Sequence, residues 1–256
     1  MKGVKMIHVF LAFFALTASP LTTLTVQTQL SSVPAIEELS GGEFAASVID
    51  LQTGEVLVST GSGSFPLDDP DIYMLAYTVE LMQENIVSPD TIVGRDETVT
   101  DRFQRAFHGN REAAGRAMWA VGLESLSAWV AGNGMTDTEL HDIQLLWAGA
   151  PETDPSMSST EYIATALQII HSGMNMSAVS EILENPDMGD GQASAIAEGW
   201  DLYGWVDSGE DHKSFVLIAL SPEGRELGLI LLSDDLCCEE KGDLAMMLLW
   251  EAASQL

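Results

Sequence analysis

The stretch at residues 43–60, EFAASVIDLQTGEVLVST, predicts two β-strands joined by a turn. Its first half, Glu43–Asp50, is rich in apolar and β-branched residues, and its second half, Glu55–Thr60, alternates between apolar and polar residues. Gln52-Thr53-Gly54 lies between the two halves, and a glycine at this place favours the tight turn of an antiparallel hairpin. The folded part of the chain is therefore expected to include a β-hairpin near its start.

Strand character returns late in the chain. Three short apolar runs, separated by turns at Ser208-Gly209 and Pro222-Glu223-Gly224, predict the strands Trp200–Val206, Ser214–Ser221 and Glu226–Ser233. Between the hairpin and these strands the pattern is helical, and Leu244–Ala253 predicts a final apolar helix. The order predicts an α/β (α+β) fold, a five-stranded antiparallel sheet flanked by terminal helices with a large all-helical insertion.

Within the helical part, Ile72–Gln83 is apolar on nearly every face, which predicts a helix that is buried on all sides. Before it, Asp69 is expected to be the N-cap, Pro70 the first helical residue and Asp71 an acid in the first turn. Three amphipathic stretches predict further helices: Glu112–Gly132, Ser159–Ser172 and Ser177–Leu183. We expect a sheet domain from residues 34–64 and 197–256, and a helical domain from residues 65–196.

The N-terminal segment has the pattern of a targeting signal. Met1–Lys5 carries two lysines, and Met6–Ala18 is almost wholly apolar but too short for a comfortable membrane span. Residues 1–18 therefore predict a signal peptide, followed by a flexible lead-in at residues 19–33, and export to the periplasm or the extracellular space. Leu16 stands where a small residue is preferred before cleavage, so a retained anchor is one alternative, and a buried N-terminal helix is another.

The composition excludes several classes of protein. The chain has 39 acidic residues against 10 Lys and Arg, a net charge of −29, which excludes nucleic acid and anionic membrane surfaces as natural partners. Apolar residues make up 46%, which excludes general disorder, and two cysteines exclude a disulfide framework. Four lysines and acids spread along the chain favour solubility in a salt-rich medium.

Several local strings, in this order and spacing, resemble a known family. Ala46–Val58 (ASVIDLQTGEVLV) resembles an opening hairpin, and Ser64–Leu67 (SFPL) resembles the segment before a nucleophile helix. Gly134–Leu140 (GMTDTEL) and Ser158-Ser159-Thr160 resemble a later loop and helix start. The family is that of the serine β-lactamases and penicillin-binding proteins, most closely the class A type. The resemblance covers about residues 34–256 and implies a β-lactamase-like fold.

The first catalytic motif of that family, S-x-x-K, is missing. The resemblance places the nucleophilic serine at Asp69 or Pro70, so that the activating lysine becomes Ile72 or Tyr73. Neither residue can act as the base that activates a weak nucleophile. The lysines of the chain, Lys2, Lys5, Lys213 and Lys241, do not follow a serine at this spacing. The aspartates around Pro70 have a structural explanation, since carboxylates stabilise a helix N-terminus.

The other motifs of the family are also altered. S-D-N is best matched by His108-Gly109-Asn110, which keeps only the asparagine, and His108 is either a titrating group or a solvated loop residue. K-T-G is matched by Asp207-Ser208-Gly209, or in a shifted register by Trp205-Val206-Asp207. In the first register the lysine that attracts a substrate carboxylate is replaced by an acid, which would repel it. Glu152 is the one candidate for the expected loop glutamate, and a solvated acid is its alternative.

No motif predicts a cofactor or a resident metal. The acidic pairs Asp187 with Asp190 and Asp234 with Asp235 have no ligand spacing typical of a calcium loop. Cys237 and Cys238 are adjacent, and form either a strained vicinal disulfide or two free thiols.

Five of the six arginines lie within 22 residues: Arg95, Arg102, Arg105, Arg111 and Arg116. The resemblance places this segment beside the S-D-N position and hence beside the cleft. Two interpretations remain open, intramolecular pairing with the acidic residues of the protein, or a patch that binds an anion or a partner.

The sequence thus leaves three hypotheses. In the first, the protein is a non-catalytic member of the fold that binds a small molecule or a protein at the former active-site cleft. In the second, it is a diverged hydrolase that uses Ser64 or Ser208 as nucleophile and His108 as base. In the third, an uncleaved N-terminus holds a scaffold component at a membrane. The most informative observation is whether the cleft between the sheet and the helical block is open or is filled by Tyr73, Trp205 and their neighbours.

Overall fold

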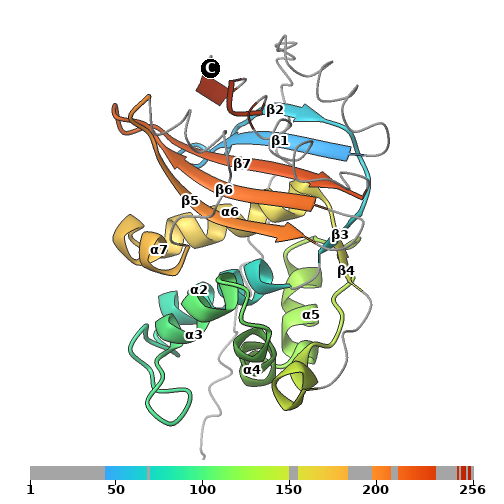
Figure 1. Cartoon of the computed structure of the whole chain (residues 1–256), viewed down its shortest axis with the longest axis vertical. Helices are drawn as coiled ribbons and strands as arrows, with labels where there is room; N and C mark the ends of the chain where they lie inside the picture. Colours follow the sequence, from blue (N-terminus) through green and yellow to red (C-terminus); the bar gives the residue numbers. More distant parts are fainter. Residues whose placement is uncertain are drawn as a thin grey trace, which may run out of the picture.

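A computed structural model of the chain describes residues 44–67, 70–149, 155–183, 198–208, 213–234, 247, 249–251 and 253–254. Its centre is an antiparallel sheet with the strand order β2-β1-β7-β6-β5 (Figure 1). The five strands, all predicted from the sequence to within two residues, are β1 (Phe44–Asp50), β2 (Val56–Thr60), β5 (Asp201–Ser208), β6 (Lys213–Leu220) and β7 (Glu226–Ser233).

The central strands are buried on both faces, which explains their nearly continuous apolar sequences. On one face Ile49, Val216 and Ile230 belong to the core that the sheet shares with the helices. On the other face, Val48 and Leu229 belong to a second core with Leu249 and Trp250. Residues 247, 249–251 and 253–254 are helical, so the predicted C-terminal helix is confirmed where the structure describes it. The helical block lies on one side of the sheet, and the described C-terminal helical residues lie on the other (Figure 1).

The segment inserted between β2 and β5 is mostly helical and lies on one side of the sheet (Figure 1). A short antiparallel ribbon of β3 (Phe65–Leu67) and β4 (Ser156–Ser158) lies between this helical block and the main sheet. In the described part of the chain, no helix combines the length and the apolar composition that crossing a membrane requires. The helices are α2 (Asp71–Gln83), α3 (Val99–Phe107), α4 (Arg111–Val121), α5 (Leu123–Gly132), the 3₁₀ helix η1 (Gln144–Ala148), α6 (Thr160–Gly173) and α7 (Met176–Ile182).

The apolar helix α2 is buried along most of its length, as its sequence predicts. Its start differs from the prediction, because Pro70 is the N-cap and the helix begins at Asp71. The carbonyl oxygen of Pro70 accepts hydrogen bonds from the amides of Tyr73 at 3.0 Å and Met74 at 3.1 Å. Proline lacks an amide hydrogen and therefore loses nothing at a position where that group has no helical partner.

The amphipathic stretch Glu112–Gly132 was predicted as one helix and forms two, α4 and α5. Gly122 separates them with a φ of +82° and a ψ of 122°, values outside the right-handed helical region. Glycine adopts positive φ without the steric cost of a side chain. The break lets α5 run in a different direction from α4 (Figure 1).

Candidate functional site

The first turn of α2 is the place where the sequence resemblance would put a nucleophile and its base. Tyr73 is fully buried there, and its hydroxyl forms a hydrogen bond with the hydroxyl of Ser158 on β4. The hydroxyl oxygen of Thr138 lies 3.4 Å from that of Ser158. Pro70 is also buried, and Asp69 lies outside the described residues. The structure thus brings together three hydroxyl groups from parts of the chain that the sequence analysis had treated separately.

Burial raises the pKa of Tyr73 well above its ordinary value of 10.0, although the hydrogen bonds with Ser158 and Thr138 act in the opposite direction. A phenol with a raised pKa keeps its proton at neutral pH and cannot take one from a neighbouring hydroxyl. Ile72, the alternative counterpart of the lysine, carries no titratable group. In either register, the described first turn of α2 contains no general base at the position expected for the lysine.

Aromatic side chains of the edge strand β5 and of α3 pack against each other. The rings of Trp205 and Phe107 lie 5.3 Å apart between centroids with an interplanar angle of 59°, and both residues are buried. The ring of Phe107 also lies near that of Phe103, with 6.4 Å between the two ring centroids. Such tilted pairs add a favourable contact to the burial of apolar area. A ligand entering between β5 and α3 at this point would have to displace Trp205.

The edge of β5 takes part in a second contact with the helical block. The amide of Gly204 donates a hydrogen bond of 3.0 Å to the carbonyl of Leu183, just after α7. An edge strand otherwise offers unpaired amides and carbonyls to an extended ligand. At Gly204 the outward-facing amide is already bonded to Leu183 and does not remain for such a ligand.

His108 and Asn110 lie between α3 and α4. His108 is exposed at the C-cap of α3. Asn110 is the N-cap of α4, and its side-chain oxygen accepts a hydrogen bond of 2.9 Å from the amide of Ala113. Asn110 therefore has a structural role that the sequence analysis did not assign to it. Among the described residues, no hydrogen bond joins His108 to the exposed Ser64, so the structure does not assemble that proposed pair.

Asp207 and Ser208 end β5, and their backbones pair with Ser214 and Lys213 of β6. The side chains of Asp207 and Ser208 lie outside the described part, as does Gly209. Other residues named in the sequence analysis also lie outside the described part: Glu152, Asp187, Asp190, Asp235, Cys237 and Cys238. Over the residues whose placement the structure gives, no group of three His, Cys, Asp or Glu side chains is arranged to hold a metal ion.

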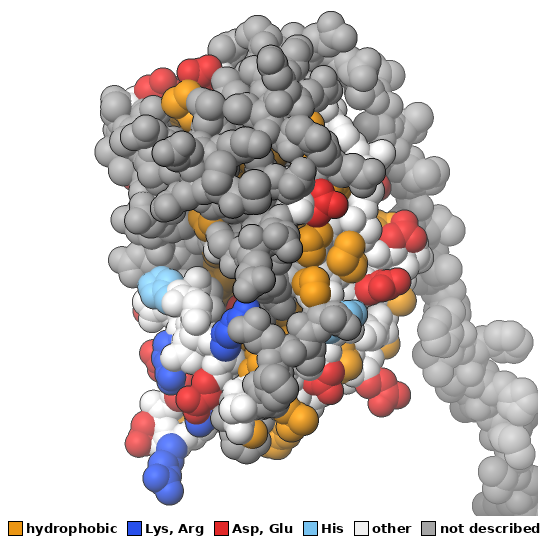
Figure 2. All heavy atoms as spheres, turned by 45° about the vertical axis from the view of Figure 1, so that its right-hand side comes forward, with side chains coloured by type: hydrophobic (Ala, Val, Ile, Leu, Met, Phe, Trp, Pro, Cys, Tyr) orange, Lys and Arg blue, Asp and Glu red, His pale blue; other side chains and the backbone are white. Residues whose placement is uncertain are grey.

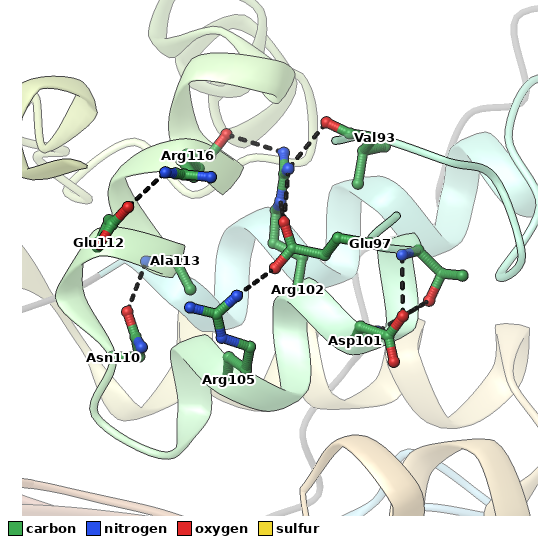
Figure 3. Close-up of polar contacts among 10 residues, drawn as sticks. Val93, Glu97, Asp101, Arg102, Arg105, Asn110, Glu112, Ala113 and Arg116 are labelled. Carbon is green, nitrogen blue, oxygen red and sulfur yellow. Dashed lines mark hydrogen bonds and ion pairs between the residues drawn. The ribbon is translucent and has the colours of Figure 1, made fainter. Parts of the chain in front are cut away.

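The arginine-rich segment forms a network of ion pairs (Figure 3). Arg102, whose side chain is 5% exposed, donates hydrogen bonds to Glu97 at 2.8 Å and 3.2 Å and to the carbonyl of Val93 at 2.8 Å. Arg105 pairs with the other oxygen of Glu97 at 2.9 Å, and Arg116 pairs with Glu112. For these three arginines the contacts agree with intramolecular pairing. On the face drawn in Figure 2, the basic side chains gather in one region and the acidic side chains are spread.

The helix that carries Arg102 and Arg105, α3, begins with a cap that is visible in the sequence but was not among the predictions. Thr98 and Asp101 form a reciprocal capping box at the beginning of α3. Hydrogen bonds from the backbone amide and hydroxyl of Thr98 lower the pKa of Asp101. The T-x-x-D spacing of these residues is a sequence-level sign of a helix start. The Trp205–Phe107 contact has no such local signal, because it joins residues far apart in the chain.

Comparison with solved structures identifies the architecture. An ancestral (GNCA) class A β-lactamase superimposes with a TM-score of 0.69 at 16% identity, covering 88% of this chain and 98% of that one. A class A β-lactamase from Mycobacterium abscessus superimposes with a TM-score of 0.65 at 12% identity, covering 87% of this chain and 99% of that one. The chain has the class A β-lactamase fold. At these identities the likeness concerns the fold alone.

Comparisons at the level of sequence give no further assignment. No protein-family model matches the chain, and no curated protein matches it.

Proposed function

We propose that the protein is an exported, non-catalytic binding protein built on the β-lactamase fold. The observation that carries the proposal is the state of Tyr73, which is buried, hydrogen-bonded to Ser158 and held in its neutral form by a raised pKa. A serine nucleophile needs a neighbouring base, and neither Ile72 nor Tyr73, the two counterparts of the activating lysine, can supply one.

Two further features support a role without covalent chemistry. Trp205 and Phe107 are packed against each other where β5 meets α3, so the space for a substrate is reduced there. Asn110 is engaged as the N-cap of α4, which leaves its side-chain oxygen committed to the helix. A partner, whether a small molecule or a protein, would meet the rim of the cleft near the exposed His108 rather than its packed centre.

The proposal is tested with the purified mature protein. The protein is incubated with a chromogenic cephalosporin and with a fluorescent penicillin, hydrolysis is followed by absorbance, and adducts are sought by intact mass spectrometry. We expect neither turnover nor a mass increase. Turnover or an adduct that disappears in Ser64→Ala or in Ser208→Ala would overturn the proposal and favour the diverged hydrolase. An active class A β-lactamase serves as the positive control.

The export part of the proposal rests on the apolar segment Met6–Ala18 behind two lysines. When the full chain is expressed in a bacterium, we expect cleavage after Ala18, so that the secreted protein begins at Ser19. N-terminal sequencing of the protein from the periplasm or medium checks this. A product that keeps Met1 and sediments with membranes would favour the anchored alternative.

A further inference from the structure

A pocket lies inside the helical block, apart from the positions at which the resemblance places catalytic residues. It has a volume of about 140 Å³ and is lined by residues of α2, α3, α4 and the segment between α2 and α3. Its lining does not include Tyr73, His108, Asn110 or Trp205. The pocket is therefore separate from the contact between β5 and α3, and a function for it is independent of whether the protein is catalytic.

The pocket has a buried floor and an exposed mouth. Val99, Phe103 and Ala117 line it and are each at most 5% exposed. Val87 and Ala120 also line it, and the structure leaves Val87 partly exposed and Ala120 exposed. A ligand can thus reach the floor from solvent without the unfolding of a helix.

Three side chains of the lining carry polar groups, Tyr77, Thr78 and Arg102, and two of them, Thr78 and Arg102, are engaged within the chain. The hydroxyl of Thr78 donates a hydrogen bond of 2.7 Å to the carbonyl of Met74. The guanidinium of Arg102 is held by Glu97 and by the carbonyl of Val93. Because these groups already have hydrogen-bond partners within the chain, they would add little binding free energy for a polar or charged ligand. The remaining lining is almost wholly aliphatic and aromatic.

Arg102 also determines the shape of the pocket. It connects α3 to the segment between α2 and α3 through Glu97 and Val93, and it approaches the carbonyl of Arg116 on α4 at 3.5 Å (Figure 3). Val93 itself lines the pocket. The ion-pair network thereby holds one wall of the pocket in place.

We propose that this pocket binds a small uncharged apolar molecule, of the size of one aromatic ring or a short branched alkyl group. An apolar cavity of about 150 Å³ accommodates benzene in another protein, and the volume here is close to that. Exposed apolar side chains adjoin mouth residues in the sequence: Ile86 before Val87, Ile92 before Val93 and Trp119 before Ala120.

The test uses toluene as the probe and the full mature chain. Binding is measured by saturation-transfer NMR of toluene and by its effect on the unfolding temperature. We expect saturable binding and an unfolding temperature that rises with toluene concentration. Benzoate and benzylamine, which carry a charge on a ring of similar size, are expected to bind at least about tenfold more weakly because their charge would be desolvated without a free partner.

Two matched variants locate the site. Ala120 on α4 and Ala128 on α5 are both exposed helical alanines, but only Ala120 lines the pocket. Ala120→Phe places a ring at the mouth, and we expect it to weaken toluene binding by about tenfold or more. Ala128→Phe is expected to leave binding unchanged. No saturable binding by the wild type, equal binding by both variants, or tighter binding of benzoate than of toluene would each overturn the proposal.

Discussion

The hydroxyl group of Tyr73 joins two parts of the fold that are far apart in the sequence. The side chain crosses from the first turn of α2 to β4 and meets Ser158, which is itself fully buried. A buried hydroxyl must find a partner, because losing its hydration without one is costly. Tyr73 therefore links the helical block to the ribbon of β3 and β4 through a side-chain hydrogen bond. In the unfolded chain, both hydroxyl groups form hydrogen bonds with water instead.

Tyr73→Phe removes this bond while keeping the ring. We expect the free energy of unfolding to fall by about 1–2 kcal/mol, because Ser158 then loses one of its two neighbouring hydroxyl groups. Urea denaturation followed by circular dichroism measures the change. Tyr203→Phe on β5 is the control, since the Tyr203 hydroxyl forms no hydrogen bond with a described residue. Equal losses in the two variants would show that the Ser158 contact is not responsible.

The raised pKa of Tyr73 also predicts a pH dependence. Above about pH 10 the tyrosine ionises in the unfolded chain but keeps its proton in the folded one. The folded state then binds more protons than the unfolded state, so stability that is fully present below pH 10 is lost as the pH rises. Between pH 10 and pH 11 the wild type should lose about 1 kcal/mol more than Tyr73→Phe does. Parallel slopes for the two proteins would contradict the assignment.

At the scale of single elements, β5 depends on a glycine. Gly204 has a φ of +155°, and a Cβ built there would lie 2.1 Å from the carbonyl oxygen of Val216 and 2.8 Å from the Cα of Leu217. Both contacts are with the backbone of β6, which cannot move aside without breaking the sheet. At Gly204, the edge strand β5 thus approaches β6 more closely than a residue with a side chain allows.

Gly204→Ala is therefore expected to lower the free energy of unfolding by about 3 kcal/mol, through steric overlap and backbone strain. Gly132→Ala, at the end of α5, is a suitable control because a Cβ there meets no atom within 4 Å. It should be neutral, or stabilising by up to about 1 kcal/mol. Thermal unfolding of both variants checks the prediction. A Gly204→Ala protein as stable as the wild type would mean that β5 does not lie this close to β6.

The arginine network predicts a clear difference between two neighbouring residues. Arg102→Met leaves the Val93 carbonyl and part of Glu97 without their donor in a buried place, so we expect a loss of about 3 kcal/mol. Arg105→Met affects an ion pair whose arginine side chain is 50% exposed, so we expect at most about 1 kcal/mol. Guanidinium denaturation curves give both values. A larger effect at Arg105 than at Arg102 would contradict the network as described.

The elements were predictable where short-range patterns determine them. Alternating or continuous apolar runs bounded by turns gave the strands of the sheet, and α2 was recognisable because it is apolar on every face. The sequence did not reveal that Gly122 divides one amphipathic stretch, since glycine is tolerated within helices as well as between them. The site was less predictable, because Tyr73 with Ser158 and Phe107 with Trp205 are contacts between distant segments with no local signal.

At the scale of the whole molecule, the net charge of −29 makes the folded chain repel itself. Salt screens this repulsion, since the Debye length falls from about 10 Å at 0.1 M to about 3 Å at 1 M. We expect the unfolding temperature to rise when KCl is increased over this range. Sucrose at equal osmolality is the control, because it stabilises by exclusion without screening charge. An unfolding temperature that falls with KCl would count against adaptation to a salt-rich medium.

The position of β1 in the sheet has a consequence for the order in which the protein is assembled. Along its whole length β1 pairs with β7, from Phe44 opposite Ser233 to Asp50 opposite Leu227, across the entire helical block in the sequence. During synthesis the centre of the sheet cannot form until residue 233 has left the ribosome, and β1 with β2 is until then an isolated hairpin of marginal stability. Because its sheet closes so late, the chain stays unfolded during most of its synthesis, and this is the state that the proposed export through a membrane channel would require.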